Sequence, residues 1–264
     1  MKLNWGEKRY YSSLKDDSFM HTKVLKKKNI KNNYRYLPRK LIVRGLRWVF
    51  YYFFAAPICF LITKINCGVK VKGRENLKKF KGGAILIGNH SHVLDCMLAS
   101  VYVGFPRRNY FVSNKDAVQV AVGRYFTKAL GVLPLPDEQK GLINLANAIN
   151  ILLKKGNTVT IYPEASIWPY STFLRPLPPA TFHYAVKSDV PVVPFAVTYR
   201  YAKFRPKAKK PKVNITILEP IYPNHELSIV ERKQDLCNKT TQALKNVIET
   251  EDNVKLFEYV QLAE

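Results

Sequence analysis

The stretch GAILIGNHSHVLDCML, residues 83–98, decides the fold, because it joins an apolar run to a polar turn and then to a second apolar segment. The run AILIG is nearly continuous in apolar residues, which predicts a central strand buried on both faces. The segment VLDCMLASVYV, residues 93–103, predicts a helix. His90 lies between the two, just beyond the carboxyl end of the strand, where open α/β sheets place their functional groups.

The chain beyond residue 67 repeats this alternation of short apolar runs and helical segments. The other runs that predict strands are VKVKG (69–73), NYFVS (109–113), GVLPLP (131–136), TVTIYP (158–163), PVVPFAVTY (191–199) and VNITIL (213–218). Further helices are predicted at 117–130, 140–156, 179–188 and 227–249. This alternation predicts an α/β fold, with a mixed, largely parallel sheet covered by helices on both faces.

The composition is that of a packed protein with an anionic partner. The 264 residues include 47% hydrophobic ones and carry a net charge of +24, so nucleic acid or the negatively charged cytoplasmic face of a membrane is expected to bind. The four cysteines show no C-x-x-C pair, which indicates neither a disulfide framework nor a zinc ribbon and favours an intracellular protein. Cys96, beside Asp95, is a conceivable nucleophile, although a small buried residue is the commoner role.

A basic segment next to an apolar segment favours the membrane. Residues 23–47 hold ten basic residues and no acid, and WVFYYFFAAPICFLI follows at once, residues 48–62. Lysines would face lipid head groups, and Trp48, Tyr51 and Tyr52 suit the interface. Nucleic acid cannot use an apolar segment of this kind, so no nucleic-acid partner is predicted, although a basic nucleic-acid-binding protein remains the non-enzyme alternative.

The apolar segment is expected to dip into one leaflet. Fifteen helical residues reach ~22 Å, short of the ~30 Å hydrocarbon core, and Pro57 would kink or break the helix. A monotopic protein at the cytoplasmic face is therefore predicted, with a buried core helix as the alternative. Residues 1–66 form the N-terminal membrane-association segment and residues 67–264 the α/β domain; residues 1–22 are expected to be a tail or a short surface helix.

His90 and Asp95 have the spacing of a general base with its orienting carboxylate. Side chains on a helix lean toward its N-terminus, so Asp95 in the first turn can reach a loop residue five positions earlier. The carboxylate would hold one imidazole nitrogen while the other takes a proton. Two alternatives remain: a metal-dependent hydrolase that uses His90, His92 and Asp95, and polar residues that cap a helix. Because catalytic zinc needs three protein ligands and the other histidines stand alone, no metal is predicted, and His92 is interpreted as structural.

The pattern N-H-x-x-x-x-D after a buried strand resembles the first motif of the glycerolipid acyltransferases, the family that includes 1-acyl-glycerol-3-phosphate acyltransferase. Three further stretches resemble the family's second, third and fourth motifs, in the family's order. They are GVLPLP (131–136), YPEASIWP (162–169) and VPVVPFAV (190–197). The resemblance covers about residues 70–200, most of the predicted globular part.

The resemblance implies an O-acyltransferase. An acyl chain would pass from a thioester, on coenzyme A or acyl carrier protein, to a hydroxyl of a lysophospholipid or related amphiphile. His90 would activate that hydroxyl and Asp95 would orient His90, because an alcohol at neutral pH is a weak nucleophile until it loses its proton. No cofactor is implied beyond the thioester co-substrate, and the N-terminal segment would keep the enzyme where its lipid substrates dissolve.

The motifs also depart from the family pattern. Asp137 and Ile167 stand where arginines are usual, and Ala165 replaces a glycine. Those arginines are expected to bind an acceptor phosphate, so a phosphate-bearing acceptor would need other cations. Candidates are Arg175, Lys115 and Arg124; alternatively the acceptor is a different amphiphilic hydroxyl compound.

Four residues are predicted to bind substrate or shape its site: Asn89, Glu164, Ser166 and Arg175. Glu164 follows a strand and could face His90 across the site. Ser166 has a turn-forming role as its alternative. Asn89 is interpreted chiefly as fixing the turn before His90.

Overall fold

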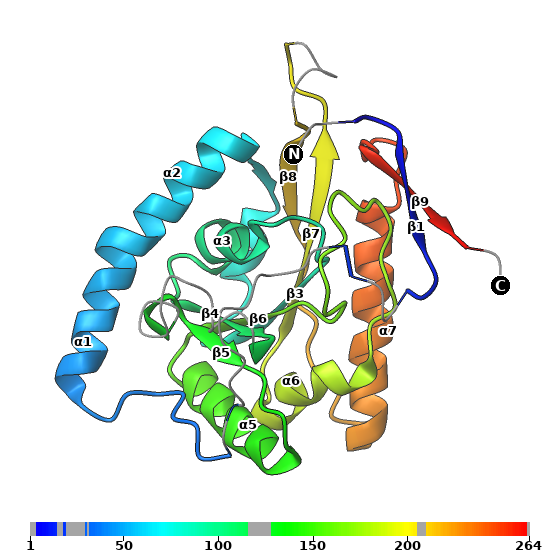
Figure 1. Cartoon of the computed structure of the whole chain (residues 1–264). Coiled ribbons are helices and arrows are strands. Elements are labelled where there is room, and N and C mark those ends of the chain that lie inside the picture. Colours follow the sequence, from blue (N-terminus) through cyan, green and yellow to red (C-terminus); the bar gives the residue numbers. More distant parts are fainter. Residues whose placement is uncertain are drawn as a thin grey trace.

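The structure of the protein, a computed structural model, describes residues 4–14, 18–19, 30, 32–115, 128–204 and 210–262. Within these residues the centre is a seven-stranded sheet with the strand order β2-β8-β7-β3-β6-β4-β5 (Figure 1). Its strands are β2 (Lys70–Lys72), β3 (Ala84–Gly88), β4 (Asn109–Ser113), β5 (Val132–Pro134), β6 (Thr158–Ile161), β7 (Val192–Arg200) and β8 (Lys212–Ile217). The neighbours from β7 to β5 are parallel, and β8 pairs antiparallel with β7. The predicted mixed, largely parallel sheet is confirmed.

Helices cover both faces of this sheet, as predicted. One face carries α5 (Gln139–Lys154), η5 (Pro179–Phe182), α6 (His183–Ser188) and α7 (Ile229–Ile248). The other carries α1 (Leu41–Val49), η1 (Phe50–Ala55), α2 (Ala56–Cys67), α3 (Asp95–Leu98) and η3 (Ala99–Gly104), while the short η2 (Arg74–Lys78) follows β2. The helix predicted at 117–130 lies mostly outside the described residues.

The central strand β3 explains why there are two cores. All five of its residues are buried, and successive side chains point to opposite faces. Ile85 and Ile87 pack with α5, α6 and α7, whereas Ala84 and Leu86 pack with the helices of the other face. A polar side chain in this run would be buried without a hydrogen-bond partner, which costs free energy, so an apolar run is favoured.

The apolar N-terminal segment is longer and more regular than the sequence predicted. α1, η1 and α2 form one helix, Leu41–Cys67, so the break expected at Pro57 is not found. A π-helical turn, Phe50–Ala55, precedes the proline, and the Ala56 N–H donates to the Tyr51 carbonyl five residues back. We infer that this wider turn leaves room for the proline ring, which would otherwise meet the carbonyl four residues earlier.

The helix is longer than the fifteen-residue apolar run, so its length alone does not limit it to one leaflet. Its 27 residues reach ~40 Å, and by length and composition it could cross a membrane. Only 22% of its 18-residue apolar stretch is buried, so the alternative of a buried core helix is wrong.

Two strands from opposite ends of the chain lie side by side. β1 (Glu7–Tyr11) pairs in parallel with β9 (Phe257–Gln261), so the expectation of a tail or helix over residues 1–22 is wrong at this strand. The Tyr259 ring stacks on Trp168 with centroids 5.0 Å apart, and its hydroxyl donates to the Pro169 carbonyl at 2.8 Å. This small sheet therefore supports the loop that follows β6. The division of the chain between residues 66 and 67 stays a prediction.

Candidate active site

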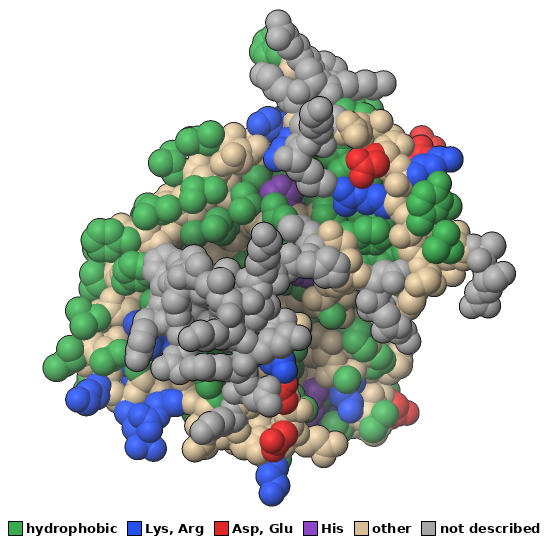
Figure 2. All heavy atoms as spheres, viewed as in Figure 1, with side chains coloured by type: hydrophobic (Ala, Val, Ile, Leu, Met, Phe, Trp, Pro, Cys, Tyr) green, Lys and Arg blue, Asp and Glu red, His purple; other side chains and the backbone are tan. Residues whose placement is uncertain are grey.

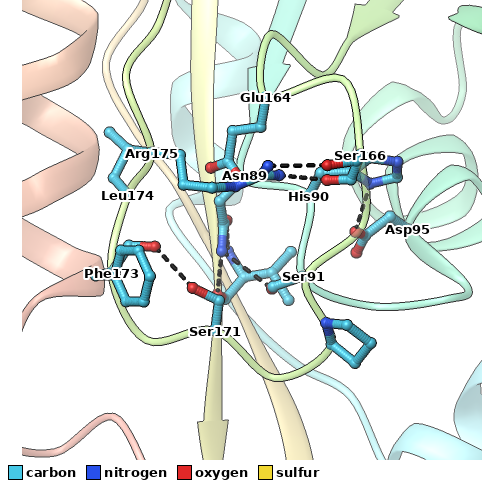
Figure 3. A network of polar contacts seen from close by, with 12 residues as sticks. Asn89, His90, Ser91, Asp95, Glu164, Ser166, Ser171, Phe173, Leu174 and Arg175 are labelled. Atoms are coloured by element: carbon cyan, nitrogen blue, oxygen red, sulfur yellow. Dashed lines mark hydrogen bonds and ion pairs between the residues drawn. The ribbon is translucent and has the colours of Figure 1, made fainter. Parts of the chain in front are cut away.

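His90 and Asp95 meet beyond the carboxyl end of β3. The His90 Nδ1 lies 3.0 Å from the Asp95 Oδ2, and that oxygen also accepts the backbone N–H of His92 at 2.9 Å (Figure 3). Asp95 is the first residue of α3, so it reaches back to the loop as its position predicts. The Asp95 carboxylate is fully buried, whereas 14% of the His90 side chain is exposed.

This contact defines the state of the imidazole. A carboxylate only accepts hydrogen bonds, so the Nδ1 of a neutral His90 carries the proton and Nε2 keeps a lone pair. His90 lines a groove that reaches the surface. A group with a fixed tautomer and a lone pair at the edge of a groove can accept a proton from a bound hydroxyl.

Tyr162 packs against both members of this pair, although the sequence did not single it out. Its ring stacks on the His90 ring with centroids 4.4 Å apart and planes 13° apart. Its hydroxyl donates to the Asp95 backbone carbonyl at 2.8 Å. Burial, and then the Asp95 charge, raise the pKa of Tyr162 well above its ordinary value, so the hydroxyl stays a donor. Tyr162 directly follows β6, the parallel neighbour of β3, and only that pairing reveals its place.

The turn before His90 is fixed by its neighbours on β7. The Asn89 side chain donates to the Val197 carbonyl at 2.9 Å and accepts the Val197 N–H at 2.8 Å. A Cβ on Gly88 would lie 2.4 Å from the Phe195 ring, so only glycine allows this approach. Asn89 is buried and does not line the groove, which places it as a residue that holds the turn.

The loop after β6 is built around a second charged pair. The Arg175 Nη2 lies 2.8 Å and its Nε 3.0 Å from the Glu164 Oε2, with 1% of each side chain exposed. Arg175 also donates to the Ser166 hydroxyl at 3.0 Å and to the Ser166 carbonyl (Figure 3). Its guanidinium carbon lies 4.8 Å from the centre of the Trp168 ring. Burial raises the pKa of Glu164, and the Arg175 charge opposes this rise. The pair holds the loop in shape.

Backbone hydrogen bonds join this loop to the His90 segment. The Trp168 N–H donates to the His90 carbonyl at 3.1 Å, and the Tyr170 N–H donates to the Ser91 carbonyl at 2.7 Å. Ala165 has a φ of 62°, a conformation that favours glycine. This accounts physically for the glycine that the related motif has at this place.

The groove beside His90 has a volume of about 1510 Å³. Of the four residues predicted to bind substrate, Ser166 lines it, whereas Asn89, Glu164 and Arg175 do not. Apolar side chains that line the groove include Val93, Val112, Leu135, Leu142, Ile143, Ala146, Ile161 and Ile167. The groove therefore fits an extended apolar ligand with a reactive group at His90.

The cations considered for an acceptor phosphate are already engaged or lie elsewhere. Lys115 forms an ion pair with Asp137, whose second oxygen accepts the Ile30 N–H at 3.1 Å. The hydrogen bond from Lys115 lowers the pKa of the Asp137 carboxyl. Arg175 is buried against Glu164, and Arg124 lies outside the described residues.

The described residues do not provide a set of metal ligands at His90, His92 and Asp95. The His92 Nδ1 accepts the Leu94 N–H at 3.1 Å, and its Nε2 lies 3.9 Å from the Cys67 sulfur. His92 does not line the groove, and across the described ranges no three His, Cys, Asp or Glu side chains converge as metal ligands. Burial lowers the pKa of His92, so it stays neutral as a structural acceptor.

The alternative nucleophile, Cys96, is held as a thiol. Burial and the neighbouring Asp95 charge raise the pKa of Cys96 to about 12. A thiol in that state is a poor nucleophile.

Comparisons with known proteins agree with this geometry. The model of the acyltransferase family matches residues 68–198. An uncharacterized acyltransferase of Schizosaccharomyces pombe is 28% identical over 202 residues, covering 74% of this chain and 70% of that protein. The crystal structure of the 1-acyl-sn-glycerophosphate acyltransferase PlsC from Thermotoga maritima shares the fold, with a TM-score of 0.55 at 19% identity over 80% of this chain and 84% of that one. The resemblance to the glycerolipid acyltransferases is thus confirmed, with residues 68–198 of the chain matching the acyltransferase family.

Proposed function

We propose that the protein moves an acyl chain from a thioester, on coenzyme A or acyl carrier protein, to a hydroxyl of a lysophospholipid or related amphiphile. The observation that carries this proposal is the His90–Asp95 hydrogen bond at the edge of an apolar groove. The proposal needs no cofactor beyond the thioester and no nucleic-acid partner.

The reaction follows from the state of the imidazole. The acceptor hydroxyl gives its proton to His90 Nε2 as its oxygen attacks the thioester carbonyl carbon. Asp95 stabilises the imidazolium that forms, because its carboxylate accepts the hydrogen bond from Nδ1–H. The tetrahedral intermediate then breaks the carbon–sulfur bond, and the leaving thiolate takes a proton from the imidazolium. The products are an ester and a thiol, and His90 returns to its neutral form.

The exposed face of the Leu41–Cys67 helix supports a place at a membrane surface. Its exposed large apolar side chains are Leu41, Ile42, Leu46, Trp48, Val49, Phe53, Phe54, Ile58, Phe60, Leu61 and Ile65. In Figure 2 hydrophobic side chains gather along the edge where Figure 1 places α1 and α2, with Lys and Arg side chains at its lower end. A continuous apolar surface of this kind is unusual for a monomer in water.

The opposite face of the same helix supports a monotopic arrangement. Tyr51, Ala55, Ala56, Thr63 and Cys67 are buried. The helix lies along the α/β domain. If the helix crossed the membrane, the polar surface of that domain would enter the hydrocarbon core, at a high free-energy cost. We therefore propose that the helix lies in one leaflet, with basic residues toward the anionic cytoplasmic face.

The test of the activity is an acyl-transfer assay with purified protein. Labelled acyl-coenzyme A and acyl-carrier thioesters are incubated with a panel of lysolipids and uncharged monoacyl acceptors, beside a His90→Ala control. Formation of a labelled diacyl product by the wild type alone is expected. Failure of every donor and acceptor pair, or equal product with His90→Ala, overturns the proposal. Product formation that EDTA abolishes would favour the metal alternative instead.

The test of the membrane site is sedimentation with anionic liposomes. Phe53→Asn together with Leu61→Asn removes apolar contact on the helix, so bound protein should fall by at least ~10². Ile229→Asn together with Val230→Asn alters equally exposed apolar residues on α7 and is the matched control. Equal loss in both pairs means that the membrane face lies elsewhere.

A further inference from the structure

The groove has a second polar region, which the proposed chemistry at His90 does not use. α6 contributes His183 and Lys187, which lie four residues apart and so share one helix face. α7 contributes Lys233, and Thr181 adds a hydroxyl from the turn before α6. All four line the same groove as His90.

These cations line one groove, with His183 and Lys187 on one face of α6 and Lys233 on α7. Partial burial lowers the pKa of His183, and the positive charges of Lys187 and Lys233 lower it further. Like charges held together cost free energy unless an anion joins them.

Acidic residues close in sequence to these cations already have partners. Asp189 contacts His225 at 3.0 Å, Asp235 contacts Lys239 at 2.8 Å, and Glu231 caps α7 through Ser228. Within the described part of the chain, the carboxylates that form ion pairs do so with cations other than Lys187 and Lys233. The polar contact that the structure gives Lys187 is a long one, 3.4 Å to the Asn147 side chain. The cluster is therefore a concentrated positive charge with hydrogen-bond donors directed at a ligand groove.

We infer that His183, Lys187 and Lys233 bind a phosphate group of a substrate whose acyl-bearing part lies in the groove. This inference rests on the proposed function. A phosphate offers several acceptor oxygens and a negative charge, which two ammonium groups match, and the His183 ring can donate a hydrogen bond to it. It also gives the chain a cationic site, now that Asp137 and Ile167 stand in place of the family's arginines.

The position of the cluster favours the donor as the source of the phosphate. Figure 1 places α6 and α7 on the side of the molecule away from α1 and α2. A water-soluble thioester donor, whose carrier arm contains phosphates, would approach from that side, whereas a lipid acceptor would enter from the membrane face. An acceptor head group offers the same chemistry, and the experiment separates the two sources.

The first arm is a binding measurement that needs no turnover. Inorganic pyrophosphate is titrated into the full-length protein while the ring protons of His183 are followed by NMR, with His183→Gln to assign them. Saturable shifts are expected, and the anion should raise the pKa of His183. Lys187→Gln with Lys233→Gln should weaken binding about tenfold. The matched control is Lys154→Gln with Lys155→Gln, two exposed lysines with the same total charge that do not line the groove.

The second arm identifies the source. KM is measured for acyl-coenzyme A and for an acyl thioester of N-acetylcysteamine, which has no phosphate. If the donor phosphate binds, the Lys187→Gln, Lys233→Gln variant raises KM for acyl-coenzyme A about tenfold and leaves the short thioester unchanged. If the acceptor phosphate binds, KM for a lysophospholipid rises with either donor, and KM for a monoacylglycerol does not.

The outcomes separate this inference from the proposed function. Pyrophosphate binding that the groove variant weakens supports the site even where no transfer is detected, in which case the proposed function alone fails. No saturable binding by the wild type, or equal weakening by the two lysine pairs, overturns the phosphate site whatever the activity.

Discussion

Two carboxylate pairs stand on neighbouring loops of the sheet, and they differ in one respect. His90 and Asp95 follow β3 with a contact of 3.0 Å, and Glu164 and Arg175 follow β6 with one of 2.8 Å. The His90 side chain keeps part of its surface in the groove, whereas both members of the second pair are buried and Arg175 donates to Glu164 and Ser166. A charged pair can do chemistry only if one member keeps a free polar atom within reach of a ligand. The second pair has no such atom in the groove and serves as support.

The two pairs are mechanically linked. The loop that Arg175 holds together also carries the Trp168 N–H, which donates to the His90 carbonyl. Changes to the supporting pair should therefore alter stability first and turnover second, and changes to His90 should do the reverse. Mutations in each pair can test this difference between effects on stability and effects on turnover.

The largest expected effect is on turnover. His90→Ala removes the proposed general base, so kcat should fall by at least ~10² while the melting temperature stays within a few degrees of the wild type. The assay is transfer of labelled acyl groups, with thermal unfolding measured in parallel. His225→Ala, which alters an exposed histidine away from the groove, should retain full turnover. A normal kcat in His90→Ala would mean that His90 is not the general base, so the two pairs would not differ in their role.

The next effect is on stability. Arg175→Met leaves the Glu164 carboxylate buried without its cation, which should destabilise the fold by about 3 kcal/mol in urea unfolding. The exposed pair of Lys239 and Asp235 gives the control, because Lys239→Met should cost less than about 0.5 kcal/mol. If the two substitutions cost the same, the buried pair is not the support that its geometry indicates.

The same variant should show a dependence on pH. Burial raises the pKa of Glu164, and removal of Arg175 takes away the charge that opposes this rise. A carboxyl whose folded pKa lies above its unfolded value binds protons more readily in the folded state, so stability falls as the pH rises between the two values. The stability deficit of Arg175→Met should therefore shrink as the pH is lowered from 8 toward 5. A deficit that is constant over that range would contradict the assignment to Glu164.

A smaller effect separates the two contacts of Tyr162. Tyr162→Phe keeps the ring against His90 and loses the hydrogen bond to the Asp95 carbonyl, so kcat should fall by about five- to tenfold with KM unchanged. Tyr162→Leu loses both contacts and should fall further, with a shift in the pH profile of kcat as the imidazole is held less firmly. Equal kcat values for the two variants would mean that the stacked ring contributes nothing.

Local patterns in the sequence predicted the first pair, and the second needed the fold. The β3 run is apolar at every position, and Asp95 lies only one helical turn from the His90 loop, so both could be predicted from spacing. Tyr162 meets His90 because β3 and β6 pair with Ile87 opposite Ile161, a register that no local signal specifies. Arg175 was expected at the substrate, yet the loop turns it back into the protein toward Glu164.

In two other regions the structure differs from what the sequence predicted, for related reasons. β1 pairs with β9, and a contact between chain ends leaves no periodic pattern in either segment. Pro57 predicted a kink or a break, because a proline in the interior of a regular α-helix disturbs it, but a π-helical turn just before Pro57 changes the hydrogen-bond pattern locally. In both regions the deciding interaction was one that residue type and spacing do not encode.

The smallest expected effect concerns the strain in the supporting loop. Ala165 has a φ of 62°, which costs an L-residue about 1–2 kcal/mol, so Ala165→Gly should remove that cost. The gain is offset by about 0.4–1 kcal/mol, because glycine makes the unfolded chain more flexible. Urea unfolding should show a net stabilisation of about 0.5 kcal/mol, with kcat unchanged. Ala185→Gly, in the helix α6, should instead destabilise by at least about 1 kcal/mol, because it also removes a buried methyl group. If Ala165→Gly lowers stability to the same extent, the loop holds its shape by the Ala165 methyl group, and the Arg175 pair carries less of the support than its burial indicates.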